Sequence, residues 1–271
     1  ADEDFHFAIA RASECPGFER IMLNEVYFQL RVHRLRSSTR PGRAEEALNE
    51  HFSIFEAIRD RSPEEAESRM RSHVRAARES TLSHFGSIEH VVHAAAIGSG
   101  KFGFPFTNLT PDDWPSVLEV NIMGMVRVAH CLAPSLQEQA GGSMTFLASV
   151  AGQIGSQTDP PYSASKAANI NFAQCLAKDL AASGVRVNVV NPGMVPTALN
   201  RSVSQAWHSR QTAQASKSYE EWAQQKIRQI VPLGRWQTAD DIANAIVFLS
   251  SPRAANITGQ CLNVDGGFVM H

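Results

Sequence analysis

The sequence predicts an α/β protein, with a doubly wound parallel sheet over residues 86–271 and an all-α helical segment over residues 1–85. After residue 86, apolar runs typical of buried strands alternate with helical patterns. Before it, apolar residues recur only at helical spacing. The composition changes at the same point, because residues 1–85 hold 13 Arg, no Lys, 15 acidic residues and only two of the 17 glycines. This shift predicts a domain boundary near Phe85-Gly86.

Three or four helices and no strands are expected in the first part. Its apolar residues at helical spacing are Phe5, Ala8 and Ile9; Phe18, Ile21 and Met22; Leu48, Phe52 and Phe55; and Met70, Val74 and Ala77. Residues three and four apart share one helical face, so each group predicts a helix. The run Ser62-Pro63-Glu64-Glu65 predicts a capping box with proline at the first helical position.

The second part alternates strands and helices. The expected elements are a strand His90–Ala96, a helix capped by Thr110 that runs toward Leu136, a strand Ser143–Ser149, a helix from Pro161 to about Ala182, a strand Val185–Asn191, a polar stretch from Asn200 to about Gln229, a capped helix Thr238–Ser250 and a last strand Gln260–Val264. Ligands of open α/β sheets bind outside the carboxyl ends of the strands. Ser149 and Pro192-Gly193 both fall at such ends.

Ser149, Tyr162 and Lys166 stand in the spacing S-x12-Y-x3-K. Tyr162 and Lys166 are four apart and share one helical face. An ammonium beside a phenol favours the phenolate, so a tyrosine in this position can pass a proton to or from a substrate oxygen. A serine hydroxyl at a strand end can hydrogen-bond the same oxygen. The alternative for Tyr162 and Lys166 alone is a helix with a half-exposed tyrosine and a solvated lysine.

Further motifs surround these residues: Asn121 in LEVNIMG, Pro192-Gly193 in NVVNPGMVPT and Asp265-Gly266-Gly267 in ITGQCLNVDGG. From about Ile88 onward, their order and spacing resemble the short-chain dehydrogenase/reductase family. The segment PLGRWQTADDIANAIVFLSSPRAANITGQ is similar to the C-terminal region of that family. The resemblance implies a Rossmann-like fold and hydride transfer between NAD or NADP and a carbonyl or alcohol substrate.

The resemblance also implies roles for individual residues. The catalytic tetrad falls on Asn121, Ser149, Tyr162 and Lys166, and the cofactor-binding residues on Ala94, Ala95, Tyr162, Lys166, Pro192, Gly193 and Thr197. Tyr162 would transfer the hydroxyl proton, and Lys166 would lower the pKa of Tyr162 and bind the nicotinamide ribose. Ser149 would stabilise the substrate oxygen, Asn121 would order a relay water, and Thr197 would contact the carboxamide.

Two larger features follow from the same resemblance. The stretch from Asn200 to about Gln229 would be a substrate lid, with a surface helix pair as the alternative. The helices Asp113–Leu136 and Pro161–Ala182 would form a dimer or tetramer interface.

The cofactor-binding start of such a fold is missing from the sequence. A dinucleotide fold opens with a strand, a glycine-rich turn and a helix that receives the pyrophosphate, yet only Gly17 and Gly42 precede Gly86. His93-Ala94-Ala95-Ala96 stands where the family has Asn-Asn-Ala-Gly. We therefore expect weakened contacts to the adenosine side of the cofactor, and an uncovered edge on strand His90–Ala96.

A candidate metal site lies in the first part. Asp2 and His6 are four apart on one helical face, and His51 and His73 lie on later helices. One carboxylate and three imidazoles can bind zinc, nickel or manganese, although histidines on helices are more often surface or core residues.

The runs DEDFHFAIARAS, NEHFSIFEAIRDRSPEEAESRM and RSHVRAA resemble the later half of the FCD ligand-binding domain of FadR-type GntR transcription regulators. That resemblance implies a metal that helps to hold a small carboxylate. The alternative function is therefore a metal-dependent effector-binding module with an inert reductase remnant.

The chain thus reads as a join of two partial families. An engineered or recombined chimera, a natural fusion, and a sequence that does not correspond to one native gene would each explain it. Because the first residue is Ala1 and not Met, we expect a processed or trimmed start. No DNA-reading domain is visible, and the net charge of −2 gives no reason to expect DNA or membrane binding. The four cysteines are scattered, which predicts buried thiols in a reducing, cytoplasmic compartment.

Overall fold

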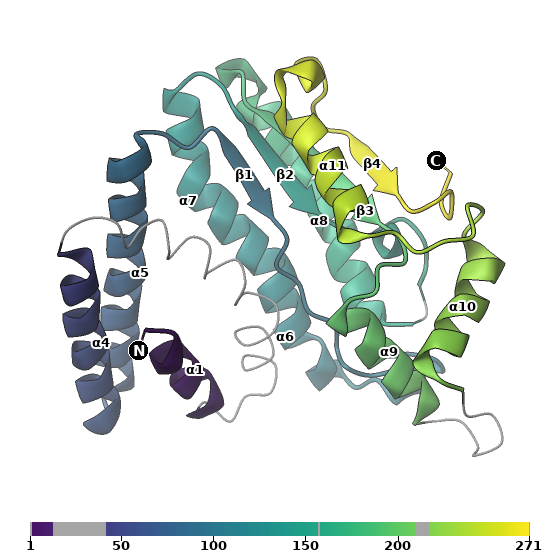
Figure 1. The fold of residues 1–271 in the computed structure, drawn as a ribbon, viewed down its shortest axis with the longest axis horizontal. Helices are drawn as coiled ribbons and strands as arrows, with labels where there is room; N and C mark the ends of the chain where they lie inside the picture. The colour runs from purple at the N-terminus through teal and green to yellow at the C-terminus, as the bar shows by residue number, and fades with distance from the viewer. Residues whose placement is uncertain (1, 13–41, 157, 210–216, 271) are drawn as a thin grey trace. The chain divides into compact units, whose positions relative to one another are not determined.

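A computed structural model describes residues 2–12, 42–156, 158–209 and 217–270. The chain folds as two compact units, Ala1–Ile88 and Glu89–His271. The first is helical and the second contains a sheet (Figure 1).

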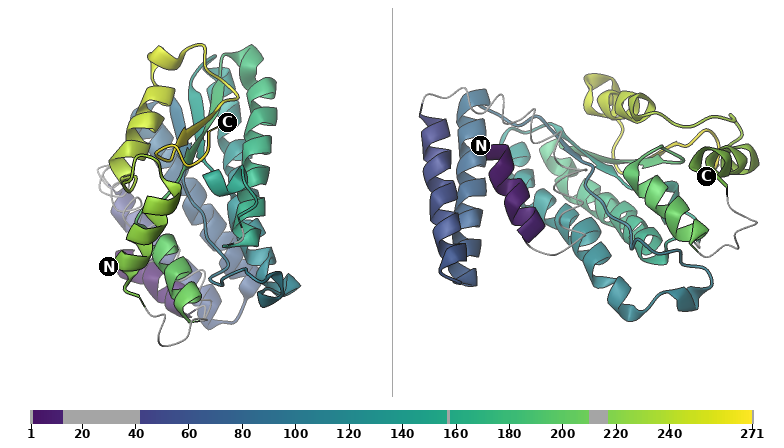
Figure 2. Two further views of the ribbon diagram at one scale, coloured as in Figure 1. Left: turned by 90° about the vertical axis from the view of Figure 1, so that its right-hand side faces the viewer. Right: turned by 60° about the horizontal axis from the view of Figure 1, so that its bottom comes forward.

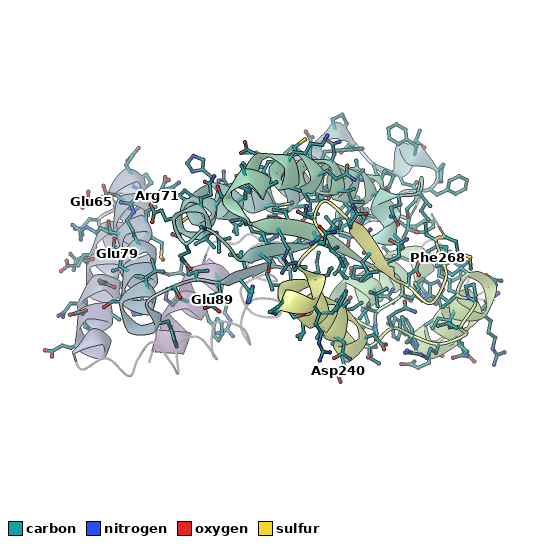
Figure 3. All side chains as sticks on the ribbon, turned by 90° about the horizontal axis from the view of Figure 1, so that it is seen from above. Glu65, Arg71, Glu79, Glu89, Asp240 and Phe268 are labelled. Atoms are coloured by element: carbon teal, nitrogen blue, oxygen red, sulfur yellow. The ribbon has the colours of Figure 1, made fainter. Side chains whose placement is uncertain are left out.

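The described part of the first unit consists of α1 (Asp2–Ala12), α4 (Arg43–Arg59) and α5 (Pro63–Phe85), with no strand among these residues. The two long helices lie side by side (Figure 1), because Asp60–Ser62 turns the chain back on itself. Ile54 and Ala57 of α4 are buried. Charged side chains such as Glu65, Arg71 and Glu79 project outward from α5 (Figure 3). The helix expected around Phe18, Ile21 and Met22 lies outside the described residues.

Two local details of the first unit differ from expectation. The apolar residues that predict α4 are exposed, Leu48 by 48%, Phe52 by 59% and Phe55 by 53%. The buried face of α4 instead carries His51, Ile54 and Ala57.

The capping box predicted at Ser62 is also wrong. Ser62 is the N-cap residue and proline occupies the first turn, but the Ser62 side chain makes no capping hydrogen bond. The Glu65 carboxylate that would complete the box instead accepts a hydrogen bond from Arg69 Nε at 2.7 Å.

The second unit is built on a four-stranded parallel sheet in the order β1-β2-β3-β4. The strands are β1 (His90–His93), β2 (Ser143–Leu147), β3 (Arg186–Pro192) and β4 (Cys261–Val264). The central strands β2 and β3 are rich in buried apolar residues, as expected for strands covered on both faces. The predicted α/β class with a parallel sheet is therefore confirmed. Pairing in β1 stops at His93, whose partner in β2 is Phe146, so this strand is shorter than predicted.

Helices cover both faces of this sheet. One face carries α7 (Gly124–Glu138) and α8 (Pro160–Leu180), and the other carries α11 (Ala239–Ser250), as Figure 2 shows. The helices α9 (Ala198–His208) and α10 (Tyr219–Ile230) lie beyond the carboxyl ends of the strands (Figure 1). Short 3₁₀ turns occur at Phe106–Asn108, Pro111–Asp113, Val150–Gly152, Ala181–Ser183 and Pro252–Ala254. The predicted cap of α11 is confirmed, because Thr238 and Asp241 form a capping box.

The run Pro111–Glu138 is helical, as predicted, but its geometry changes along its length. Thr110 and Asp113 form a capping box at its start, and α6 (Pro115–Leu118) follows. A π-helical turn then spans Glu119–Met123 before α7 begins. This is the one run among the described residues that is long and apolar enough to cross a membrane by length and composition. Met125, Ala129, Ala133 and Leu136 are buried in the second unit, so this apolar face is used for packing.

His93 is a polar residue in this core. Its side chain is 8% exposed, and its ring lies 6.1 Å from that of Phe146. Burial, and after it the charge of Lys166, lower the pKa of His93 from 6.5 to about 4. The imidazole is therefore neutral near pH 7.

Candidate functional site

The helix α8 carries Tyr162 and Lys166 one turn apart, as the spacing predicts. It begins at Pro160, directly after its N-cap residue Asp159. The Asp159 carboxylate accepts hydrogen bonds from the Tyr162 N–H at 3.4 Å and, with its other oxygen, from the Ser99 N–H at 2.8 Å. Asp159 is buried and ties the segment after β1 to the first turn of α8. Asp before Pro-Pro is a helix-start signal from which this residue could have been predicted.

Lys166 is buried at the carboxyl end of β2. Its side chain is 1% exposed, and its Nζ donates a hydrogen bond to the Leu147 carbonyl at 2.8 Å. The same Nζ lies 5.5 Å from the ring centroid of Tyr162. Burial lowers the pKa of Lys166 from 10.5 to about 7. In its protonated form the group has three donors. Leu147 is its one hydrogen-bond acceptor in the described chain, so this form keeps two donors for a ligand.

Ser149 follows β2 and stands two residues beyond Leu147. Its Oγ accepts the Ala151 N–H at 3.1 Å and caps the turn Val150–Gly152, which leaves the hydroxyl hydrogen available to a ligand. A Cβ added at Gly152 would lie 2.7 Å from the Lys166 carbonyl carbon. Glycine at this position therefore lets the turn that follows Ser149 rest directly on the backbone of α8.

Asn121 is fully buried within the π-helical turn. Its Oδ1 accepts the Ile97 N–H at 2.8 Å, and its Nδ2 donates to the Ile97 carbonyl at 2.9 Å and to Ser165 Oγ at 2.8 Å. Ser165 Oγ in turn donates to the Tyr162 carbonyl at 2.7 Å. Asn121 thus joins the segment after β1 to the turn of α8 that carries Tyr162. π-helical turns occur frequently at functional sites.

Pro192 and Gly193 end β3 and pass beneath the Asp265 turn. A Cβ at Gly193 would lie 2.8 Å from Asp265 Cβ and 2.8 Å from Gln237 Oε1, so only glycine fits. Gln237 Oε1 also accepts the Met194 N–H at 2.6 Å. Buried Gln237 gives no motif in the sequence and could not have been predicted.

Thr197 lies four residues after Gly193. It is exposed, and its Oγ1 caps α9 by accepting the Asn200 N–H at 3.3 Å.

The sequence-predicted residues therefore meet at one edge of the sheet. Ser149 and Lys166 lie at the end of β2, Tyr162 lies one turn from Lys166, and Asn121 reaches the same turn of α8 through Ser165. Ala94 and Ala95 follow β1 and are exposed at the corresponding end of that strand.

This edge suits the nicotinamide side of a dinucleotide. The buried ammonium of Lys166 has donors to spare, and the hydroxyl of Ser149 has an available hydrogen. The described residues do not fit the pyrophosphate of such a cofactor, because those directly before β1 form α5 and not a glycine-rich turn.

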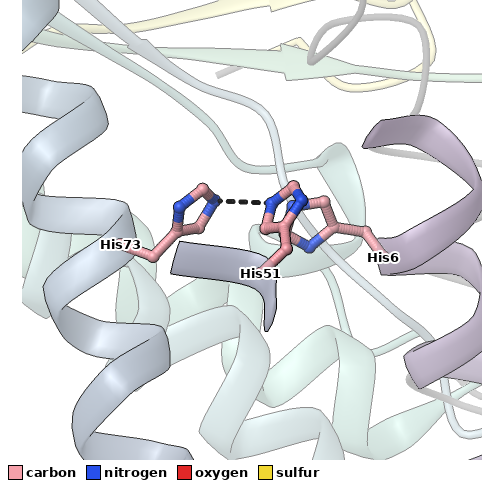
Figure 4. A group of neighbouring side chains, drawn as sticks. All are labelled: His6, His51 and His73. Atoms are coloured by element: carbon pink, nitrogen blue, oxygen red, sulfur yellow. Dashed lines mark hydrogen bonds between the residues drawn. The ribbon is translucent and has the colours of Figure 1, made fainter. Parts of the chain in front are cut away.

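A second cluster lies in the first unit, where His6, His51 and His73 come from three helices (Figure 4). All three are buried, and one ring nitrogen of each lies within 4.8 Å of the others. His51 Nε2 and His73 Nε2 are 3.4 Å apart. When two nitrogens bind one tetrahedral ion at about 2.0–2.1 Å, the distance between the two nitrogens is close to the one that separates His51 Nε2 and His73 Nε2. The side chain of Asp2, the fourth expected ligand, lies outside the described residues.

Glu50 holds the His73 ring in place. His73 Nδ1 lies 2.5 Å from Glu50 Oε2. A ring nitrogen that donates to a carboxylate leaves the other nitrogen with its lone pair, as in metal-bound histidines. The donor set therefore fits a divalent ion. The Glu50 contact was not foreseen, although Glu50 directly precedes His51 in the sequence.

Comparisons with known proteins find two families in the chain, and the two matched ranges overlap at residues 54–76. Residues 54–269 match the family model described as "Enoyl-(Acyl carrier protein) reductase", and residues 1–76 match the FCD domain. The chain is 30% identical over 192 residues to 3-oxoacyl-[acyl-carrier-protein] reductase FabG of Escherichia coli K12, which covers 71% of each protein. It is 30% identical over 182 residues to acetoacetyl-CoA reductase of Shinella zoogloeoides, with 67% of this chain and 68% of that protein covered.

A solved structure shows the same fold. The crystal structure of levodione reductase superposes with a TM-score of 0.63 at 25% identity, over 72% of each chain. The chain therefore belongs to the short-chain dehydrogenase/reductase family. It is an oxidoreductase of that type, with a Rossmann-like sheet preceded by a helical FCD part.

The buried Lys166 predicts a pH-dependent stability. Unfolding returns the amine from a pKa of about 7 to the ordinary 10.5, so the unfolded chain binds more protons between these values. The free energy of unfolding should therefore rise with pH across this window, and the cost of the buried charge is fully present below about pH 7. Lys166→Met should remove this rise, which is on the order of 4 kcal/mol. Urea denaturation of both proteins at about pH 6 and about pH 10 measures it. Equal pH slopes would show that the amine is solvated.

Proposed function

We propose that this protein transfers hydride between a nicotinamide cofactor and a carbonyl or alcohol substrate, with Asn121, Ser149, Tyr162 and Lys166 as its reaction site. The supporting observation is the under-satisfied Lys166 ammonium, buried at the end of β2 one helical turn from Tyr162. A buried, incompletely hydrogen-bonded charge destabilises the folded protein. A lysine with only a structural role would not account for this cost, whereas a lysine in a reaction site does. The bound cofactor would supply or accept the hydride.

Tyr162 is the proton-transfer residue in this proposal. The charged form of Lys166 favours the phenolate, so Tyr162 can donate a proton to a carbonyl oxygen that gains hydride and accept one in the reverse direction. The Ser149 hydroxyl donates to the same substrate oxygen as charge develops on it. Lys166 also holds the nicotinamide ribose with the donors that Leu147 does not use.

The remaining residues position these groups. Asn121 clamps the segment after β1 to α8, and this contact fixes the Tyr162 turn. Its proposed part in a proton relay would require its backbone, because its side-chain amide is engaged by Ile97 and Ser165. The carboxyl ends of β1 and β3 carry the other residues that would contact NAD or NADP, namely Ala94, Ala95, Pro192, Gly193 and Thr197.

The same proposal includes the division into domains, the oligomer interface and the cell compartment. Residues 86–271 form the catalytic part and residues 1–85 the FCD-like part. The Asp113–Leu136 helical run and α8 would form a homo-oligomer interface. The prediction that the cysteines are buried is wrong for Cys131 and Cys175, which are exposed. We assign the protein to a reducing compartment such as the cytoplasm, where scattered cysteines remain thiols.

Tyr162→Phe tests the reaction site, because it removes only the phenolic oxygen. Turnover of a ketone with NADPH or NADH should fall by at least about 100-fold, the usual contribution of a general acid. The melting temperature should stay close to that of the wild type, since the Tyr162 ring and its backbone contacts remain. Steady-state kinetics and a melting curve measure both. Turnover that survives the substitution would rule out this role for Tyr162.

A second function is supported by the histidine cluster. We infer that His6, His51 and His73, with Asp2, bind a divalent ion such as zinc, nickel or manganese. The ion would offer an open position to a small carboxylate, so the first unit would act as an effector-binding module. The observation that favours it is the burial of three imidazoles with Glu50 against His73.

Metal content tests this module without any activity assay. The purified protein should hold about one ion per chain, and His51→Ala should abolish binding. Glu50→Gln should weaken affinity by about 10- to 100-fold, because the His73 ring loses its carboxylate partner. Glu45→Gln, an exposed change on the same helix, is the matched control and should leave affinity unchanged. Elemental analysis after dialysis against graded chelator gives these values. Equal metal retention by the His51→Ala variant and the wild type would refute the site.

A further inference from the structure

A cavity of about 170 Å³ lies between α9 and α10, beyond the carboxyl ends of the strands. Its described lining residues are Arg201, Ser204, Gln205, His208, Lys217 and Tyr219. They comprise two cations, three neutral hydrogen-bonding side chains and one imidazole, with no carboxylate. This composition is that of a site for an anion.

Arg201 is held in place without being neutralised. Its guanidinium lies 4.3 Å from the centre of the Tyr219 ring, and this stacking fixes the plane of the group. No carboxylate of the described residues lies within ion-pair distance of it. The edge donors of a stacked guanidinium stay available for a bidentate anion.

Lys217 is partly offset by a carboxylate, because its charge, after the hydrogen bonds from Ser218, helps to lower the pKa of Glu221. Its Nζ donates to Gln225 Oε1 at 2.5 Å, which uses one of three donors. The nearby carboxylate of Glu221 accepts hydrogen bonds from Ser218 N at 2.8 Å and Ser218 Oγ at 3.1 Å, so it serves the cap of α10.

A second cavity in the same unit contains an arginine whose charge is neutralised, in contrast to Arg201. Arg235 lines a cavity of about 350 Å³ at the end of β4. Its two terminal nitrogens bond both oxygens of Asp241 at 2.8 and 3.0 Å, so that cation is already neutralised. Arg201 therefore keeps donors for a ligand, whereas Arg235 in the second cavity does not.

The sequence around this cavity has a matching bias. Residues 197–218 contain two Arg, one Lys and no acidic residue, in a chain whose net charge is −2. In addition, His208 Nδ1 lies 2.7 Å from the Ser204 carbonyl, and its buried Nε2 has no hydrogen-bond partner among the described residues.

The cavity is connected to the carboxyl end of β3 through Asn200. The Tyr219 hydroxyl donates to Asn200 Oδ1 at 2.8 Å, and Asn200 Nδ2 contacts Met194 Sδ at 3.9 Å. Met194 directly follows Gly193, which lies at the end of β3.

We propose that Arg201 and Lys217 bind an anionic group, a carboxylate or phosphate, on the substrate of the reductase. The substrate class is therefore an anionic carbonyl or alcohol compound. This assignment rests on the proposed function for its substrate part, whereas the anion site itself does not require turnover.

The anion site is tested first, with inorganic phosphate as the probe. Trp207 precedes His208, and the ring centroid of Trp222 lies 6.1 Å from that of Tyr219, so tryptophan fluorescence should report binding. At constant ionic strength, phosphate replacing chloride should give a saturable change in the wild type. Arg201→Gln and Lys217→Gln should each raise the dissociation constant about tenfold, as expected for the loss of a charge-assisted hydrogen bond. Arg228→Gln, an exposed change on α10 outside the cavity, should match the wild type. A linear response, or equal constants for all variants, would overturn the site.

The substrate assignment is tested with a keto acid and its methyl ester. Wild-type KM should be lower for the acid, and Arg201→Gln should raise KM for the acid about tenfold while leaving that for the ester unchanged. Equal effects on acid and ester would overturn the substrate assignment while the phosphate result stands. Absence of turnover for both compounds in the wild type would instead count against the proposed function.

Discussion

The buried ammonium of Lys166 is the constraint on which the candidate site depends. Its hydrogen bond to Leu147 joins α8 to the end of β2, and Gly152 allows the intervening turn to lie on the same stretch of helix. A cation in this position is costly, as its lowered pKa shows. The Leu147 carbonyl offsets part of this cost, because it accepts a hydrogen bond from Nζ. The charge lies 5.5 Å from the centre of the Tyr162 ring, and Lys166 is bonded to the carboxyl end of β2, the edge where ligands of parallel sheets bind.

The two ends of a dinucleotide meet different conditions in this chain. At the edge proposed for the nicotinamide, buried hydrogen bonds of Asn121, Asp159 and Gln237 hold the segments after β1 and β3 in place. At the pyrophosphate side, the sequence supplies no glycine-rich turn, and the described residues before β1 form helices that match the FCD domain. Fewer phosphate contacts mean weaker binding, so the interactions around Lys166 would carry a larger share of the affinity than in a complete dinucleotide fold.

Short-range spacing made much of this predictable. Tyr162 and Lys166 share a face because they are four apart on one helix, and Thr238 caps α11 because Asp241 stands three residues later. The same rule failed at Ser62, where Arg69 engages the Glu65 side chain that the cap requires. Long-range contacts gave no sequence signal: Gln237 against Met194, Glu50 against His73 and the clamp from Asn121 to Ser165 depend on how distant segments pack. The buried face of α4 was likewise set by its neighbours and not by its most apolar residues.

Above all, the described chain should retain a working nicotinamide-side site. A fluorescence titration of the purified protein with NADH and NADPH at matched ionic strength, with Lys166→Met as the control, measures this property. We predict saturable binding of at least one cofactor at submillimolar concentration, and its loss in the control, because the ribose contact is removed. No saturable binding up to millimolar concentration, or equal binding by the control, would show that Lys166 does not hold a nicotinamide cofactor.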